Sequence, residues 1–199
     1  MKHPLFLTIF LLVISPDFLQ ARQIGDYMSM NGVRLSYMGS VTYPGFKVGY
    51  EHTIRKVEAT ESLLNEKSYT KERYLSYSLG MYHHPTYHDN YFAQVEWNLR
   101  RQRNKGLYYE FAPGAGVSRT FLNGATYRVD HSGEVSKVPM AGNFFALLSV
   151  SGSMGYSFSL TGKLQGKAFL KPGLIFLLPY NKLVYTRPTV EVGYIVNLR

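Results

Sequence analysis

The chain contains no cysteine, a single tryptophan and few charged residues, and each shortage narrows the class of protein. Without cysteine there are no disulfides, so an exported form must be stabilised by its own core or by a membrane. After residue 21, every apolar run is interrupted by polar residues at alternate positions, so no transmembrane helix is expected. A membrane location then requires a closed β-barrel, in which strand pairing satisfies every backbone group.

Residues 1–21 are expected to be a signal peptide that is cleaved on export. Lys2 and His3 form a short polar start, Leu5 to Ile14 is an apolar run too short to span a membrane as a helix, and Leu19-Gln20-Ala21 has the small-residue character of a cleavage site. The alternative is a membrane anchor or a buried helix. With the signal removed, residues 22–199 suit one domain.

Residues 144–158 carry the clearest structural pattern. Phe144 and every second residue after it are apolar or small, with aromatic residues near both ends, whereas the intervening positions from Ser149 onward are serine or glycine. A period of two predicts a β-strand, because successive side chains point to opposite faces. A long apolar face ending in aromatic residues is typical of a strand in contact with a bilayer.

Seven other segments repeat this alternation, which predicts an all-β fold: a single antiparallel up-and-down transmembrane barrel of eight strands. The expected strands are Val33 to Gly39, Phe46 to Ile54, Arg73 to His83, Asn90 to Arg101, Leu107 to Thr120, Phe144 to Phe158, Lys163 to Leu178 and Thr189 to Leu198. Pro113 and Pro172 fall inside strands and have no N–H to donate, so irregular pairing is expected at both.

An even number of strands puts both termini on the periplasmic side and sorts the connections by side. The expected periplasmic connections are residues 55–71, 101–105 and 161–162, and the expected extracellular ones are residues 39–45, 83–89, 121–143 and 179–187. The long 55–71 connection and the short 39–45 connection depart from the usual bias towards short inner turns.

Periodicity alone leaves a soluble, lipocalin-like carrier open, in which the apolar face would line a ligand cavity. Two features favour the membrane. The polar face of residues 149–157 lacks the Lys and Glu of a water-exposed surface, and aromatic residues lie on the apolar stripe near strand ends. These aromatic residues are Tyr91, Trp97, Tyr109 and Tyr156.

If the polar face lines the lumen, its charges should pair, because an isolated charge in a narrow interior is costly. An eight-stranded barrel is just wide enough for side chains to fill it, so a sealed interior is expected within a porin-like architecture. The predicted lumen network comprises Arg34, Lys47, Glu51, Glu96, Arg100, Glu110, Lys167, Lys171 and Glu191.

Residues 121–142 form the best candidate for a surface function. Thr126 to Asp130 and Glu134 to Val138 flank His131-Ser132-Gly133 and predict a β-hairpin that projects beyond the barrel. Such a projection suits adhesion or the binding of a surface ligand, although it could equally be a solvated extension that shields the rim. The candidate binding residues are Tyr127, Arg128, Val129, His131, Glu134 and Lys137.

The sequence contains no clear metal-binding motif and no clear catalytic motif. His83, His84, His88 and Asp89 cluster in one loop, but no second group of ligands accompanies them, so neither a metal nor a cofactor is expected. Lipid-hydrolysing barrels need an activated serine, and the adjacent His131 and Ser132 would point to opposite faces of a strand. A lipid-modifying hydrolase, deacylase-like in chemistry, stays an alternative to a non-enzymatic protein.

The net charge of +9 favours anionic lipid and lipopolysaccharide as partners. Nucleic acid is not expected, because the basic residues are dispersed and the chain is exported.

The chain resembles small outer-membrane β-barrels of Gram-negative bacteria, in particular uncharacterised barrels of Bacteroidetes. The resemblance rests on residues 32–37, 44–51, 120–127 and 190–194. It implies an outer-membrane location, insertion by the barrel-insertion machinery, and a role in surface binding, adhesion or envelope integrity. Many such barrels end on an aromatic residue, whereas this chain ends Asn197-Leu198-Arg199, a weaker insertion signal.

Overall fold

The structure is a computed structural model that describes residues 31–40, 43–61, 67–103, 105–161, 164–180 and 183–198. The expected signal peptide and its cleavage site lie outside the described residues. Among the residues that are described, no helix is long and apolar enough to cross a membrane.

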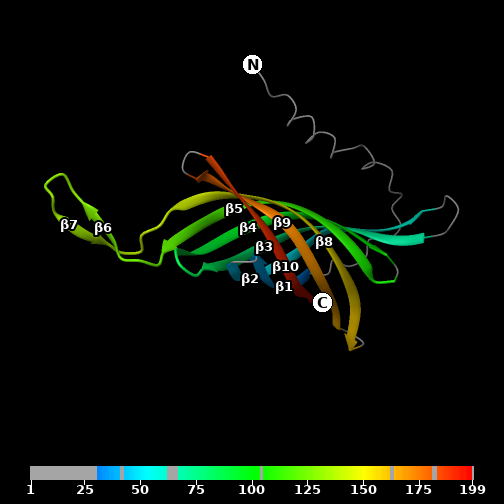
Figure 1. The fold of residues 1–199 in the computed structure, drawn as a ribbon. Coiled ribbons are helices and arrows are strands. Elements are labelled where there is room, and N and C mark those ends of the chain that lie inside the picture. Colours follow the sequence, from blue (N-terminus) through cyan, green and yellow to red (C-terminus); the bar gives the residue numbers. More distant parts are fainter. Residues whose placement is uncertain are drawn as a thin grey trace, which may run out of the picture.

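Eight antiparallel strands close into one barrel, and two short strands form a separate hairpin (Figure 1). The order around the barrel is β1-β10-β9-β8-β5-β4-β3-β2. Neighbours in the ring are consecutive in sequence except at two places, where β6–β7 is inserted between β5 and β8 and where β1 pairs with β10 to close the ring. The strands are β1 (Asn31–Ser40), β2 (Tyr43–Glu61), β3 (Lys67–His84), β4 (His88–Arg103), β5 (Leu107–Leu122), β6 (Thr126–Val129), β7 (Val135–Val138), β8 (Phe144–Thr161), β9 (Leu164–Tyr180) and β10 (Leu183–Leu198).

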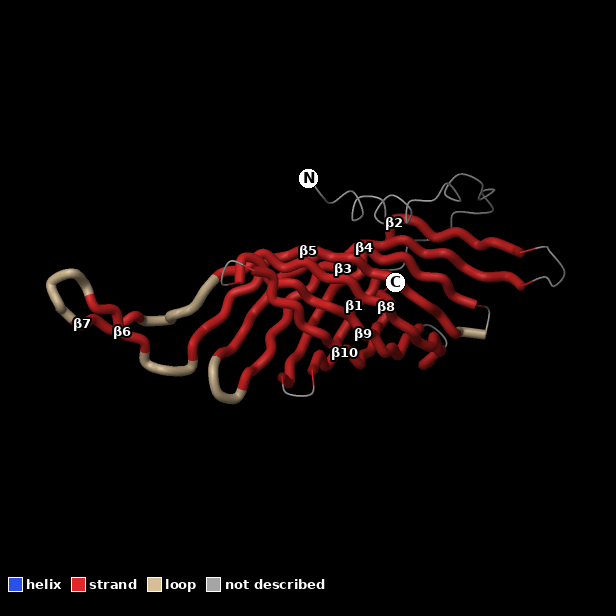
Figure 2. Tube along the Cα trace, turned by 45° about the horizontal axis from the view of Figure 1, so that its top comes forward, coloured by secondary structure: helices blue, strands red, loops and turns tan. Residues whose placement is uncertain are grey.

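The predicted fold class, an eight-stranded up-and-down barrel, is confirmed. Each expected strand falls within an observed one, apart from Lys163, which lies outside the described residues. The ring closes where β1 pairs with β10, from Asn31 opposite Leu198 to Gly39 opposite Val190. Both ends of the described chain therefore lie at one end of the barrel, the terminal end, and the β6–β7 hairpin extends from the other, the hairpin end (Figure 2).

The prediction of a long connection over residues 55–71 is wrong. β2 and β3 continue as a paired ribbon from Arg55 opposite Arg73 to Glu61 opposite Lys67, beyond the terminal end of the barrel. The sequence alternation was broken by a register shift between Thr53 and Arg55, which leaves Ile54 without a partner on β3. Past this point polar residues are no longer separated by apolar ones, as in Arg55-Lys56, so the sequence shows no stripe.

Strands are also longer than expected at the hairpin end. β9 runs to Tyr180 and β10 begins at Leu183, so the expected 179–187 loop is mostly strand. The expected 83–89 loop is similarly reduced to a turn at residues 85–87 between β3 and β4. Tertiary pairing extended these strands through segments with no clear alternation, since each backbone group gains a partner.

At Pro113 and Pro172, the two prolines expected to disturb pairing, the ladder is interrupted on one side without a register shift. Pro113 pairs with Val150 on β8, but the β4–β5 ladder skips from Glu96–Gly114 to Leu99–Phe111. Pro172 pairs with Val190 on β10, and the β8–β9 ladder skips from Ser151–Gly173 to Met154–Leu170. The missing N–H of proline therefore costs local pairing but does not displace the strand.

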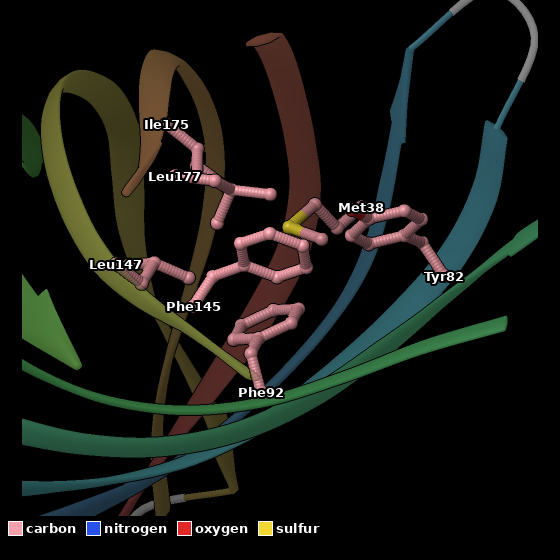
Figure 3. Close-up of a cluster of buried hydrophobic side chains, with 7 residues drawn as sticks. All are labelled: Met38, Tyr82, Phe92, Phe145, Leu147, Ile175 and Leu177. Carbon is pink, nitrogen blue, oxygen red and sulfur yellow. The ribbon is translucent and has the colours of Figure 1, made fainter. Parts of the chain in front are cut away.

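The barrel interior has two layers. Towards the hairpin end, apolar side chains fill the lumen, and the rings of Phe92 and Phe145 lie close together there (Figure 3). Charged and polar side chains fill most of the rest, together with a smaller apolar cluster of Tyr108, Phe169 and Ile195. The lumen is therefore less uniformly polar than the serine-rich part of β8 suggested, because Phe145 and Leu147 point inward on the same face as Ser151 and Ser153. The apolar layer consists of Met38, Tyr82, Phe92, Phe145, Leu147, Ile175 and Leu177.

Candidate functional site

The apolar stripe of each strand points outward and the polar stripe inward. Leu35 is 62% exposed and Phe46 is 61% exposed, whereas their neighbours Arg34 and Lys47 are 1% and 2% exposed. The lipocalin-like alternative required the opposite arrangement, with the apolar stripe around a cavity. The orientation of the stripes overturns that alternative.

All nine residues of the predicted lumen network lie buried inside the barrel, and they form two linked clusters. In the first cluster, Arg34 and Arg100 lie between Glu51 and Glu110. Arg34 Nη2 is 2.7 Å from Glu51 Oε1 and 3.1 Å from Glu110 Oε1. Arg100 Nη2 is 3.2 Å from Glu51 Oε2 and 3.0 Å from Glu110 Oε2. Each carboxylate thus binds both guanidinium groups, an arrangement that compensates charges which burial alone would make costly.

The second cluster is built on Glu96, whose carboxylate lies between two lysine amines. Lys47 Nζ is 3.2 Å from Glu96 Oε2, and Lys171 Nζ is 2.9 Å from Glu96 Oε1. Lys47 also contacts Glu191 at 2.8 Å. Lys171 Nζ lies 3.9 Å from Glu110 Oε1, which links this cluster to the first.

Sequence reasoning missed two members of the network, Glu72 and Tyr74. Glu72 accepts from Arg100 Nη1 at 3.1 Å and lies 3.4 Å from Lys167 Nζ, and its carboxylate brings the network to five acids against five bases. Tyr74 donates its hydroxyl to Glu110 and accepts from Arg100 Nη2 at 2.6 Å. Both lie on the inward face of β3, so extending the expected strand by one residue, from Arg73 to Glu72, would have found the missing acid.

The network leaves little space along the lumen. Beside Glu72 and Lys167 there is a cavity of about 40 Å³, and beside Glu96 and Glu191 one of about 10 Å³. Each is about the size that one or a few water molecules need. The interior is therefore suited to holding strands together rather than to passing a solute.

The histidine cluster divides between two surroundings. His83 Nδ1 is 2.5 Å from Asp89 Oδ1, and the two side chains are partly exposed. The rings of His84 and His88 lie 5.4 Å apart beside aromatic rings at the hairpin end. Among the described residues, no group of three or more His, Asp or Glu side chains is arranged to hold a metal ion.

The predicted hairpin is present as β6–β7, with its turn at residues 130–134. Tyr127 is 59% exposed and Val129 is 63% exposed, and the other four candidate binding residues, Arg128, His131, Glu134 and Lys137, are exposed as well. Asp130 organises the turn: its Oδ1 accepts from Ser132 Oγ at 2.5 Å, from Ser132 N at 2.8 Å and from Glu134 N at 3.1 Å. These bonds hold the pKa of the Asp130 carboxyl below its ordinary value, the Ser132 hydroxyl contributing most. The hairpin is thus an ordered, solvent-exposed projection.

Comparisons with known proteins show relatives only at the level of shape. No protein-family model matches the chain, and no curated protein matches it. Among solved structures, Neisserial surface protein A has a TM-score of 0.48 at 10% identity, over 85% of this chain and 94% of that one. The β-domain of the Bordetella autotransporter BrkA has a TM-score of 0.41 at 13% identity, over 83% of this chain and 67% of that one. The fold assignment stands on the strand order itself, and the resemblance to Bacteroidetes barrels stays a prediction.

Proposed function

We propose that this protein is an integral outer-membrane β-barrel without enzymatic activity, whose projecting hairpin serves surface binding or adhesion, or whose barrel supports envelope integrity. The observation that carries the proposal is the distribution of side chains: a continuous apolar outer surface surrounds a charged, paired interior. A water-soluble protein places its apolar side chains inside and its charged ones outside, because removing apolar surface from water lowers the free energy. A bilayer reverses that preference for the outer surface alone.

The outer apolar belt extends around the whole barrel. Every barrel strand contributes exposed large hydrophobic residues, and towards the hairpin end three aromatic residues and one methionine lie in register across neighbouring strands. Tyr37 lies opposite Phe46, which lies opposite Met81, which in turn lies opposite Tyr91. Amphipathic and aromatic rings at the edge of an apolar belt match the interfaces of a bilayer. So large an exposed apolar area is not tolerated on a soluble monomer.

Below the belt, at the terminal end, the outer surface becomes basic. Lys71 lies opposite Arg101 on β4, and Arg55 lies opposite Arg73 on β3. A basic outer surface next to an apolar belt attracts the anionic head groups of lipids. Anionic lipid and lipopolysaccharide are therefore the lipid partners that we propose, with the barrel-insertion machinery as the route of entry.

Because the lumen is filled, we infer that the function of the protein lies at its surface. With charges and apolar rings filling the interior, solute transport is not the activity that the barrel favours. The hairpin, by contrast, places Tyr127, Arg128 and His131 clear of the barrel on an ordered turn. Exposed aromatic and basic side chains on a rigid support are the composition of a binding surface.

The membrane assignment can be tested with two positions of equal exposure. Leu79 on the belt and Val135 on the hairpin are both 62% exposed. In water, arginine at either position should change the free energy of unfolding by less than about 0.5 kcal/mol. In a bilayer, Leu79→Arg should cost about 2–4 kcal/mol, while Val135→Arg should cost nothing measurable. Equal, small effects of both substitutions on unfolding from lipid vesicles would refute the assignment.

Cell fractionation tests location independently. We expect recovery with the outer membrane and a shift in gel mobility between boiled and unboiled samples, because a folded barrel resists detergent until it is heated. Recovery in the soluble periplasmic fraction without a shift would contradict the proposal.

The surface role is tested by deleting residues 123–138. If the barrel still folds and every surface-binding and envelope phenotype is unchanged, the hairpin role fails. Lipid A and phospholipid profiles should be the same with and without the gene, and an altered profile would favour the hydrolase instead.

A further inference from the structure

Arg187 on β10 is a buried cation that forms no ion pair with any acid of the described residues. It is 3% exposed, and its three guanidinium nitrogens are buried without a hydrogen-bond partner among the residues that the structure describes. It lies instead against aromatic rings: the guanidinium carbon is 3.4 Å from the centroid of the Tyr82 ring and 4.6 Å from that of Tyr43. Sequence reasoning missed this residue because it was assigned to a loop.

The contrast with the lumen network makes Arg187 unusual. Inside the network, each of the five bases has an acidic partner within 4 Å, so the buried charges are compensated. Asp89, which follows the nearby His88 in sequence, is paired with His83. Stacking on tyrosine offsets part of the desolvation cost of Arg187. Stacking does not supply acceptors for the N–H donors, which lie in the plane of the guanidinium. A buried charge without a partner normally costs several kcal/mol of stability.

Arg187 lines a cavity of about 250 Å³ at the hairpin end of the lumen, which we call the mouth cavity. Its floor is the apolar layer of Figure 3, since Tyr82 and Leu177 belong to both. Its rim reaches solvent, because Tyr87 is 65% exposed. The residues that line the cavity are Tyr43, Tyr82, His84, Tyr87, His88, Thr120, Leu177, Tyr185 and Arg187.

We propose that the mouth cavity binds a small acidic sugar, with its carboxylate or phosphate group on Arg187. A guanidinium offers a planar pair of donors that matches either group in a bidentate fashion. The volume, just below that of drug-sized pockets, suits one sugar ring. Tyrosine and histidine rings supply apolar faces for its C–H groups and polar edges for its hydroxyls. The guanidinium nitrogens are buried, so the proposal requires a ring to move on binding, and Tyr43, which is only partly buried and stacks on Arg187 at 4.6 Å, is the ring that would do so.

The test uses the full mature chain, folded in detergent, and calorimetric titration with four probes: glucuronate, glucose 6-phosphate, glucose and inorganic phosphate. We expect one or both acidic sugars to bind, and glucose to bind at least tenfold more weakly than the better acidic sugar. Tighter binding of glucuronate would indicate that the ligand carries a carboxylate, and tighter binding of glucose 6-phosphate would indicate that it carries a phosphate. Phosphate binding as tightly as either sugar would overturn the sugar class, and no binding of any probe at about 10 mM would overturn the site.

Arg187→Met should weaken acidic-sugar binding tenfold or more. The matched control is Arg119→Met, because Arg119 also stacks on two rings, Phe121 and Phe144, but lies outside the lumen on β5. Unchanged affinity in Arg187→Met, or an equal loss in Arg119→Met, would overturn the proposal. Should Arg187→Met fail to fold, Arg187→Lys replaces it: a point charge without the planar donor pair should bind several-fold more weakly, and equal affinity would exclude the bidentate role. A failure of the sugar-binding proposal would not affect the membrane assignment, since Leu79→Arg and Val135→Arg test that assignment separately.

Discussion

Glu96→Gln is the substitution that most directly tests whether the lumen network stabilises the barrel. The Glu96 side chain is 1% exposed and compensates two lysines, at 3.2 Å and 2.9 Å. After neutralisation Lys47 keeps Glu191 at 2.8 Å, but Lys171 keeps only Glu110, at 3.9 Å. The substitution thus leaves an excess buried positive charge, chiefly at Lys171.

The expected loss is about 3–5 kcal/mol, the usual cost of removing one partner from a buried ion pair. That is a large fraction of the about 5–15 kcal/mol that stabilises a typical domain, so it is readily measured. The assay is equilibrium unfolding in lipid vesicles followed by fluorescence. Trp97, the single tryptophan, is 40% exposed on the outer belt next to Glu96 in sequence, so its emission reports the transfer of β4 from lipid to water.

Two further variants isolate the mechanism. Adding Lys171→Met to Glu96→Gln removes the stranded charge, so the double variant should recover stability, with a coupling energy of about 0.5–3 kcal/mol. Glu134→Gln on the exposed hairpin loses the same charge without burial and should stay within about 0.5 kcal/mol of the natural protein. The reasoning fails if Glu96→Gln costs no more than Glu134→Gln, or if the double variant is less stable than Glu96→Gln alone.

Three other outcomes follow from the structure. Gly80→Ala should cost about 1–3 kcal/mol in vesicle unfolding, because a Cβ at this inward position would overlap the ring of Phe92 in the apolar layer. Asp130 has a lowered pKa in the folded hairpin, so its contribution to the turn is complete above the ordinary value of 3.8 and is lost as the pH falls through the lowered value. The amide resonance of Ser132, which donates to this carboxylate, should accordingly shift below about pH 4. Purified protein in planar bilayers should show no steady ion conductance.

Each of these has its own control. Gly124→Ala meets no atom within 4 Å and should leave stability unchanged. Asp130→Asn keeps an acceptor oxygen but cannot titrate, so in this variant the Ser132 amide resonance should lose the shift below about pH 4. A conductance that survives repeated purification would contradict the sealed lumen.

Much of the architecture could be predicted from the sequence because membrane strands obey a simple physical rule. A side chain on a barrel strand contacts either lipid or lumen, so residues such as Leu35 and Arg34 alternate without ambiguity. The same rule identified nine lumen charges before their partners were known. It could not pair them, since pairing depends on the stagger of strands that lie far apart in sequence.

The errors occurred where the rule stops applying. Beyond Ile54 the ribbon leaves the belt, so its residues no longer alternate and the strand was taken for a connection. Arg187 lies where strand pairing extends through a segment with Pro188 and no clear period. Its isolation from any acid is a property of three-dimensional packing, which no spacing of residues records.

The ribbon formed by the outer parts of β2 and β3 has a consequence for how the protein moves. The last pairing of β2 with β1 is Gly32 opposite Glu51, and Thr53 N reaches Asn31 Oδ1 at 3.4 Å. From there to Glu61, within the described residues, β2 pairs with β3 alone. On its other edge β3 stays paired with β4 as far as Tyr69 opposite Arg103, so the extension is a small open sheet. An open sheet resists bending less than a closed cylinder, and the bulge at Ile54 lies where the cylinder opens. We therefore expect the open extension to bend more than the closed cylinder, and Glu72, which lies on it and contacts Arg100 and Lys167, joins its base to the lumen network.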